Sequence, residues 1–254
     1  MSAKPSSFVW YELLSTDVAA AKAFYGPVIG WNIQDVPMPG MTYSLIFAGM
    51  TQVGGMMALP KDALDAMKPF WAPYVEVDDC DASASALQQL GGKIHLPPTD
   101  IPNVGRYAVA ADPQGAMFNL FKPQQSGERR VSNAPGQVGW HELHTNDWQK
   151  MFDFYREMFD WQKGDSVDMG KMGTYQPFTI DGTVSGGMFN SPGVTAAPYW
   201  LMYFNVPEID SAVMRINDAG GKITMGPHQV PGGNWIVMAA DPQGGLFALS
   251  SQRK

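Results

Sequence analysis

Cysteine is almost absent from this chain: Cys80 is the only one, so no disulfide can form within it. A lone thiol is typical of proteins that remain in a reducing compartment. The opening residues MSAKPSSFVWYELL contain no apolar core of the kind found in signal peptides. No apolar run approaches the ~20 residues needed to span a bilayer. These absences predict a cytoplasmic protein that does not cross a membrane.

Basic residues are also scarce. Lys and Arg together number 17 against 24 Asp and Glu, which gives a formal net charge of −7, and no basic cluster exceeds the pair Arg129-Arg130. This balance argues against nucleic acids and anionic membranes as partners. Hydrophobic residues make up 45% and charged residues 16% of the chain, a composition that argues against an intrinsically disordered protein.

The chain repeats itself. Residues 10–31 read WYELLSTDVAAAKAFYGPVIGW, and residues 140–161 read WHELHTNDWQKMFDFYREMFDW. The phrases GGKI and AADPQG also occur twice, and the offset is 129–130 residues throughout. A period of half the chain indicates a duplicated domain rather than a solenoid repeat. We therefore predict domains at 1–124 and 137–254, joined by a polar linker at 125–136.

Each half divides again into two cycles of one strand, one helix and three strands. Asp17 is a plausible N-cap for the first helix, and Gly91-Gly92 is a C-cap signal for the second. The expected strands are Phe8–Ser15, Thr42–Ala48, Gln52–Leu59, Trp71–Val77, Lys93–Leu96, Arg106–Ala110, Met117–Phe121, Trp200–Val206 and Leu246–Ser250, and the expected helices are 17–31, Asp79–Leu90, Asp147–Phe159 and Ile209–Ala219. Few short helices beside runs of strands predict an α+β fold, with curved mixed sheets that enclose a cavity in each half.

These phrases resemble the vicinal-oxygen-chelate superfamily, which includes glyoxalase I, extradiol dioxygenases and bleomycin-resistance proteins. The matching residues are STD, AFY and GW in the first half, TND, DFY and DW in the second, and the closing phrases DPQGAMFNLF and DPQGGLFALS. The WxEL opening of both halves is similar to two-domain glyoxalase-like proteins of bacteria. The resemblance covers essentially the whole chain and implies tandem domains of two βαβββ units each. It implies no single activity, because this fold holds both metal enzymes and metal-free binding proteins.

The resemblance also implies where a divalent metal would be bound. Enzymes of the superfamily use a His or Gln on the first strand, a His on the fifth and a Glu on the eighth. The matching positions here are Trp10, Ala72 (or Trp71) and Asn119 in the first half, and Trp140, Leu201 (or Trp200) and Ala248 in the second. Indole, alanine and leucine side chains offer no lone pair to a cation. We therefore expect neither the usual metal site nor any other cofactor, with a divalent metal at Glu142 and His144 as the lesser alternative.

Alternation along the first strand of each half places its candidate residues on one face. Trp10 and Glu12 share that face in the first half, and Trp140, Glu142 and His144 share it in the second. Tyr74, Asn119 and Tyr203 are expected to line the same cavities, with soft apolar lining from Met56, Met57, Met117, Met188, Met202 and Met238. The two glutamates are candidate polar anchors for a ligand, or general bases together with His144. The alternative is structural, with satisfied buried carboxylates and tryptophans that fill the core.

Three functions remain open. The first is a metal-free protein that binds a small, partly apolar molecule in its domain cavities. The second is a lyase, isomerase or dioxygenase of glyoxalase type, in which Glu12, Glu142 and His144 carry out proton chemistry or hold an unusual metal. The third is an interaction surface for another protein. The sequence leaves open the ligand, whether one or both halves function, and whether the chain is a monomer or a homodimer.

Overall fold

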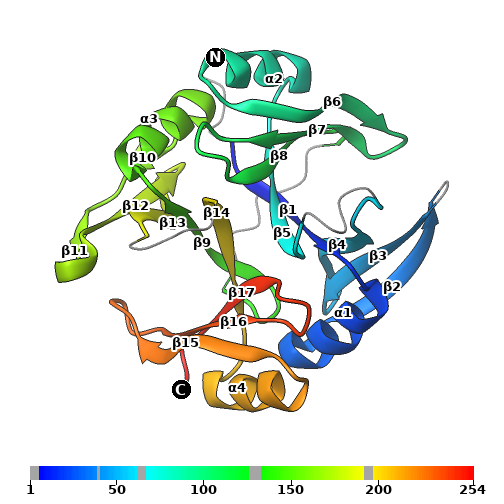
Figure 1. Ribbon diagram of the computed structural model, residues 1–254, viewed down its shortest axis with the longest axis vertical. Coiled ribbons are helices and arrows are strands. Elements are labelled where there is room, and N and C mark those ends of the chain that lie inside the picture. Colours follow the sequence, from blue (N-terminus) through cyan, green and yellow to red (C-terminus); the bar gives the residue numbers. More distant parts are fainter. Residues whose placement is uncertain (1–5, 39–40, 62–66, 126–132, 192–196) are drawn as a thin grey trace. The chain divides into compact units, whose positions relative to one another are not determined.

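The structure is a computed structural model that describes residues 6–38, 41–61, 67–125, 133–191 and 197–254. Four modules follow one another along the chain (Figure 1). The first contains β1 (Phe8–Ser15), α1 (Val18–Tyr25), β2 (Asn32–Met38), β3 (Met41–Ala48) and β4 (Thr51–Ala58). The second contains β5 (Phe70–Glu76), α2 (Cys80–Gln89), β6 (Lys93–Ile101), β7 (Gly105–Ala111) and β8 (Met117–Pro123).

The second half of the chain repeats this order. The third module contains β9 (Val138–Thr145), α3 (Trp148–Phe159), β10 (Gln162–Lys163), β11 (Val167–Asp168), β12 (Thr174–Ile180) and β13 (Thr183–Asn190). The fourth contains β14 (Tyr199–Asn205), α4 (Ile209–Asp218), β15 (Lys222–Gln229), β16 (Trp235–Ala240) and β17 (Leu246–Ser251). The predicted α+β class with tandem βαβββ units is confirmed. No helix in the described ranges is long and apolar enough to cross a bilayer.

Local chemistry explains where α1 begins and ends. The side chain of Asp17 accepts a hydrogen bond from the Ala20 N–H at the start of α1, as the sequence predicts. The helix expected to reach residue 31 instead ends at Tyr25 and passes into a π-helical turn over Gly26–Gly30. Pro27 lies at the start of that turn, and its missing N–H removes one bond of the helical ladder. The strand β2, which the periodicity did not reveal, is mostly exposed, and this explains its weak apolar pattern.

Within each module the strands pair in a mixed arrangement. The strand orders are β2-β3-β4-β1, β5-β8-β7-β6, β10-β12-β13-β9 and β14-β17-β16-β15, with β11 added beside β12. The first strand of a module runs parallel to its neighbour, and the remaining pairs are antiparallel. The helix of each module covers one face, as α4 covers β15 to β17 in Figure 1. The opposite face of β1 and β9 is where Glu12 and Glu142 lie.

The chain forms two compact units that cut across the sequence repeat. Unit I consists of residues 1–9, 72–130 and 140–200, and unit II of residues 10–71, 131–139 and 201–254. Unit I thus joins the second and third modules, and unit II the first and fourth. The predicted division at 1–124 and 137–254 remains a prediction about the repeat. Most of the expected linker at 125–136 lies outside the described residues.

The repeated AADPQG phrase explains how modules from different halves pack together in unit I. Asp112 is 2% exposed and accepts hydrogen bonds from the backbone N–H groups of Gln114 and Ala116, both at 2.9 Å. Its other oxygen accepts the Tyr155 hydroxyl of α3 at 3.0 Å, and Tyr155 accepts the Trp200 indole N–H at 3.0 Å. This motif, whose Pro and Gly are typical of a tight turn, therefore also holds the third module in place.

Unit II contains the same arrangement with the halves exchanged. Asp241 accepts the Tyr25 hydroxyl of α1 at 2.9 Å, and Tyr25 accepts the Trp71 indole N–H at 3.2 Å. The Gln243 side-chain oxygen accepts the Ser15 hydroxyl at 2.9 Å and the Asp17 N–H at 2.8 Å. The phrases STD and FY of one half are thus held by DPQG of the other. This reciprocal packing accounts for their presence in both copies.

Candidate functional site

Three side chains of the first module form a hydrogen-bonded group on the face opposite α1. The Trp10 indole N–H donates to the Tyr43 hydroxyl oxygen at 3.0 Å, and the Tyr43 O–H donates to Glu12 Oε1 at 2.8 Å. Glu12 is 7% exposed. Tyr43 reaches the glutamate by lying across Gly55, where an added Cβ would come within 2.0 Å of the hydroxyl oxygen. Glycine at this position is therefore required by the tyrosine.

The third module repeats this group. The Trp140 indole N–H donates to the Tyr175 oxygen at 2.7 Å, and the Tyr175 O–H donates to Glu142 Oε2 at 3.0 Å. Gly187 takes the place of Gly55, and an added Cβ there would lie 2.2 Å from the Tyr175 ring. The predicted Trp and Glu positions are brought together in both modules. The tyrosine that joins them was missed by the sequence analysis.

Two further polar residues extend the group of the third module. His144 Nε2 lies 2.9 Å from Glu142 Oε1, and His144 Nδ1 lies 2.8 Å from Ser191 Oγ. The imidazole stacks on the Tyr199 ring, with centroids 4.5 Å apart and planes at 12°. His144 is 7% exposed, so its orientation is fixed by packing as well as by hydrogen bonds. The prediction that Glu142 and His144 are neighbours on one face agrees with this geometry.

The tyrosines of both groups remain protonated donors. Burial, followed by the charge of Glu12, raises the pKa of Tyr43 far above its usual value. Burial and Glu142 act on the pKa of Tyr175 in the same way. Burial and the same glutamate raise the pKa of Tyr199 to about 12. These hydroxyls therefore donate hydrogen bonds throughout the physiological pH range and do not serve as bases.

The other predicted ligand residues lie in the second and fourth modules. Tyr74 pairs in register with Asn119, which is 3% exposed, and its ring stacks on Tyr107 at 6.3 Å. Tyr203 pairs with Ala248 in the fourth module and is 2% exposed. Both tyrosines are thus buried within their modules. Of the methionines considered as lining, Met56, Met188 and Met202 are fully buried core residues.

His141 directly precedes Glu142 in β9, so strand alternation turns the two side chains to opposite faces. It is 4% exposed, its ring stacks on Phe8 with centroids 3.9 Å apart, and its Nδ1 lies 2.8 Å from the Ser185 carbonyl oxygen. Burial lowers the pKa of His141 to about 4. This histidine is therefore a neutral core residue at physiological pH.

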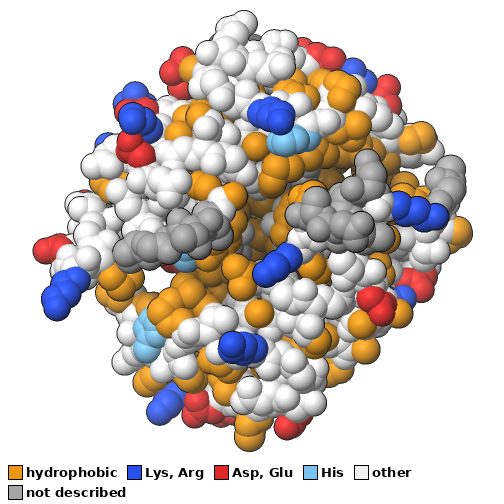
Figure 2. All heavy atoms as spheres, in the orientation of Figure 1, with side chains coloured by type: hydrophobic (Ala, Val, Ile, Leu, Met, Phe, Trp, Pro, Cys, Tyr) orange, Lys and Arg blue, Asp and Glu red, His pale blue; other side chains and the backbone are white. Residues whose placement is uncertain are grey.

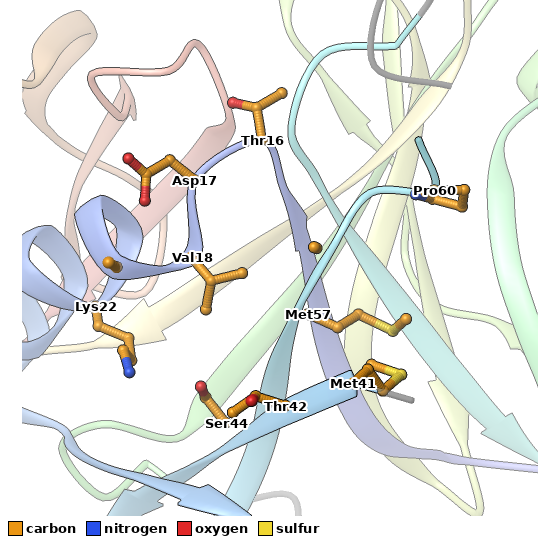
Figure 3. A pocket seen from close by; sticks show the side chains of 11 residues that line it. Thr16, Asp17, Val18, Lys22, Met41, Thr42, Ser44, Met57 and Pro60 are labelled. Atoms are coloured by element: carbon orange, nitrogen blue, oxygen red, sulfur yellow. The ribbon is translucent and has the colours of Figure 1, made fainter. Parts of the chain in front are cut away.

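A cavity of about 780 Å³ opens within unit II between the start of α1 and the strands β3 and β4. Figure 3 shows Val18 of α1 and Met57 of β4 beside it. Its lining is Thr16, Asp17, Val18, Ala19, Lys22, Met41, Thr42, Ser44, Met57, Ala58 and Pro60. None of the eight predicted ligand-binding residues is part of this lining. Met57, which the sequence analysis expected as apolar lining, is part of it. The other walls were missed because they come from a helix start and two strand ends that carry no shared motif.

A family model described as the Glyoxalase/Bleomycin resistance protein/Dioxygenase superfamily matches residues 7–120 and 137–249. The chain belongs to this superfamily. The two matches coincide with the two halves of the sequence repeat, so each half is one glyoxalase-like domain by sequence. The superfamily resemblance expected from the STD, FY and DPQG phrases is thereby confirmed.

Curated relatives and solved structures agree with this membership. The chain is 28% identical over 242 residues to a putative glyoxylase, CFP32, of Mycobacterium bovis, covering 94% of this chain and 92% of the relative. It is 29% identical over 264 residues to the anthracycline biosynthesis protein DnrV of Streptomyces peucetius, covering 98% and 94%. The Mn(II)-bound glyoxalase of Novosphingobium aromaticivorans matches with a TM-score of 0.68 at 17% identity, covering 99% of this chain and 83% of that one. At this identity the structural match shows the glyoxalase-superfamily fold alone.

Homoprotocatechuate 2,3-dioxygenase of Brevibacterium fuscum has the same fold. It matches with a TM-score of 0.69 at 16% identity, covering 100% of this chain and 83% of the dioxygenase. Glyoxalases and dioxygenases are therefore comparably similar to this chain in fold. The choice between activities rests on the residues of the site.

Replacing Tyr175 with phenylalanine is expected to lower the free energy of unfolding by about 1–3 kcal/mol, because the buried Glu142 loses a donor and the Trp140 N–H loses its acceptor. Chemical denaturation monitored by tryptophan fluorescence measures this loss. Tyr43→Phe, which makes the same change in the first module, is the matched variant and is expected to give a similar value. A loss below about 0.5 kcal/mol in both variants would show that the shared Trp–Tyr–Glu group does not stabilise this glyoxalase-like fold.

Proposed function

We propose that the protein binds a small, partly apolar molecule, and that the cavity of unit II is the place where it does so. The observation that carries this proposal is the cavity volume of about 780 Å³, which falls within the range of small-molecule sites. Val18, Met41 and Met57 give it apolar walls, and Thr42 and Ser44 add a few polar groups. Thioether side chains adapt to varied ligand shapes, so the lining favours a flat or irregular apolar molecule.

The charges at the cavity favour a neutral or cationic ligand. Lys22 Nζ lies 2.8 Å from Asp35 Oδ2, so its positive charge is already engaged. Asp17 adds a carboxylate to the lining. The related proteins DnrV and DauV are named for anthracycline biosynthesis. An anthracycline, which joins a fused aromatic ring system to an amino sugar, combines the apolar surface and the positive charge that this lining favours.

We propose further that binding requires no metal ion. The superfamily resemblance assigns Trp10 and Trp140 to the position of the first metal ligand, and an indole N–H only donates. Each of these N–H groups already donates to a tyrosine oxygen. Within the described residues, no group of three or more His, Cys, Asp or Glu side chains is placed to hold an ion. This donor set does not fit a divalent cation, because such ions need several O, N or S ligands.

Titration of the protein into a fluorescent anthracycline tests the binding proposal. We expect a saturable change in fluorescence, and the same dissociation constant after dialysis against EDTA. Ala19→Trp places an indole in the cavity lining and is expected to weaken binding at least about 10-fold. Ala20→Trp, at the next exposed position of α1 and outside the lining, is the matched control and should bind like the wild type.

The controls separate the possible failures of this proposal. Equal affinity of Ala19→Trp and wild type would place the ligand elsewhere. The absence of saturable binding to the wild type would refute binding of this ligand class. Loss of binding after EDTA treatment, restored by a divalent ion, would overturn metal independence. Charged side chains are dispersed on the face shown in Figure 2, which supports a small molecule rather than a nucleic acid as the ligand.

The second candidate is an enzyme of glyoxalase type that performs proton transfer. The hydrogen bond between His144 and Glu142 favours it, because a carboxylate-oriented imidazole is a common general base. Under this candidate, purified protein would convert a hemithioacetal of methylglyoxal, and Glu142→Gln would abolish turnover without early unfolding. We also propose a cytoplasmic location, because the single cysteine, Cys80, is a buried free thiol and a lone thiol is typical of a reducing compartment.

A further inference from the structure

A continuous chain of hydrogen bonds crosses the third module and ends at a serine hydroxyl. It runs from the Trp140 indole to Tyr175, from Tyr175 to Glu142, and from Glu142 through His144 to Ser191. The four donor–acceptor distances are 2.7, 3.0, 2.9 and 2.8 Å. All five residues belong to unit I. Ser191 takes no part in the cavity proposed above.

Donor and acceptor chemistry fixes the direction of this chain. An indole N–H only donates, so the Tyr175 oxygen accepts from Trp140 and its own O–H points to Glu142 Oε2. A carboxylate only accepts, so a neutral His144 carries its proton on Nε2, facing Glu142 Oε1. The lone pair of Nδ1 then faces Ser191 Oγ. The imidazole is therefore set to accept the serine proton.

Packing holds the imidazole in this orientation. Tyr199 stacks on one face of the His144 ring, and Phe189 meets it at 66° with centroids 4.8 Å apart. Ser191 itself is half-buried rather than enclosed in the core. A buried base hydrogen-bonded to the hydroxyl of a partly exposed serine is the arrangement by which enzymes activate a serine.

The first module lacks the equivalents of His144 and Ser191, the two residues that complete the hydrogen-bond chain of the third module. It retains the group of Trp10, Tyr43 and Glu12, but Leu14 occupies the position of His144. Leu59 occupies the position of Ser191: the Leu59 N–H donates to the Ser15 carbonyl, just as the Ser191 N–H donates to that of Thr145. Two apolar residues in one copy are thus matched by a base and a hydroxyl in the other. A purely structural role of the shared group does not require this paired change.

We propose that Ser191 is a nucleophile, activated by His144 and Glu142, that accepts the acyl group of small carboxylic esters. Its Oγ forms a bond to the carbonyl carbon while its proton passes to His144 Nδ1. The ester C–O bond breaks, and the leaving alcohol takes that proton. Water then attacks the acyl-serine in the same way and restores the hydroxyl, releasing the acid. Neither step requires an oxidant, a reductant or a metal.

Labelling with an alkyl fluorophosphonate tests this proposal, because the reagent phosphonylates activated serines with loss of fluoride. We expect one adduct per chain, mapped to Ser191 by peptide mass spectrometry, and release of p-nitrophenol from p-nitrophenyl acetate. Ser191→Ala should abolish the adduct. His144→Leu, which copies the first module, should slow labelling on the order of 100-fold, since a positioned general base contributes about 10²–10⁴. Ser85→Ala, an exposed helical serine outside the chain of bonds, should label like the wild type.

The melting temperature of each variant separates loss of the base from loss of the fold. Should His144→Leu melt early, His144→Gln removes the basic nitrogen with a polar side chain and provides the same comparison. An adduct absent from Ser191 in the wild type would overturn the proposal. So would an unchanged labelling rate in a folded His144 variant, because a serine that reacts without the imidazole is not activated by it. Ala19→Trp should label normally, so failure of ligand binding in the unit II cavity and failure of this proposal are distinguishable.

Discussion

Replacing Asp112 with alanine is expected to lower the free energy of unfolding by about 3–5 kcal/mol. The substitution removes both carboxylate oxygens from a buried site, and three donors lose this acceptor: the N–H groups of Gln114 and Ala116 and the Tyr155 hydroxyl. Each buried donor left without an acceptor costs about 1–3 kcal/mol. Burial raises the pKa of Asp112, and these hydrogen bonds act against that rise. The ionised form of the buried carboxyl group is therefore stabilised by them.

Urea denaturation at neutral pH measures this loss, and Asp112→Asn is the matched control. Asparagine keeps the size of the side chain and one oxygen acceptor, so we expect it to retain part of the lost free energy. Asp241→Ala makes the equivalent change in unit II, where Asp241 accepts from Tyr25, Gln243 and Gly245. A loss below 1 kcal/mol for both alanine variants would contradict the conclusion that the repeated phrase holds modules of different halves together.

Many helices and strands can be predicted from the sequence, because the patterns that determine them lie within the element itself. Strand alternation in Phe8–Ser15 reproduces the bounds of β1 and places Glu12 opposite the helix. The caps at Asp17 and Asp79 each accept an N–H three residues on, as their position before an apolar helix predicts. Local periodicity therefore suffices for element type and for the face on which a residue lies.

The partners of these residues are harder to predict because they come from distant parts of the chain. Tyr43 reaches Glu12 from 31 residues away, and Tyr175 reaches Glu142 from 33. The dipeptide Thr-Tyr recurs at 42–43 and 174–175, at the offset of 132 shared by the glycine pairs of β4 and β13, and this signal was available in the sequence. The contact of each tyrosine with a glutamate could not be predicted from this repeat, because the number of residues between two contacting side chains on different strands is not fixed.

The DPQG motif is a second case in which local sequence did not predict distant contacts. DPQG has the composition of a tight turn, and the Gly115 N–H does donate to the Asp112 carbonyl. The contacts of Asp241 and Gln243 with Tyr25 and Asp17, however, span more than 200 residues. The turn composition alone explains the residues of DPQG, so nothing local indicates its long-range contacts. Only the exact repetition of the motif suggested a role beyond the turn.

Acidification is expected to destabilise the protein through His141 by about 3 kcal/mol. The folded-state pKa of about 4 lies below the ordinary value of 6.5, so the folded state binds fewer protons than the unfolded state between these values. The contribution is therefore fully present above about pH 6.5 and is lost as the pH falls towards 4. A difference of about 2.5 in pKa, at 1.36 kcal/mol per unit, gives the stated magnitude.

Unfolding free energies measured at intervals from pH 7.5 to 4 in the wild type and in His141→Phe isolate this contribution. Phenylalanine retains the stacking on Phe8 but loses the hydrogen bond to the Ser185 carbonyl, so the variant should be less stable at pH 7.5 by about 1 kcal/mol. Its stability should fall less steeply with acidification, so that it equals or exceeds that of the wild type near pH 4. Parallel curves for His141→Phe and wild type would show that burial does not lower the pKa of His141, because only a pKa lowered on folding links stability to pH in this direction.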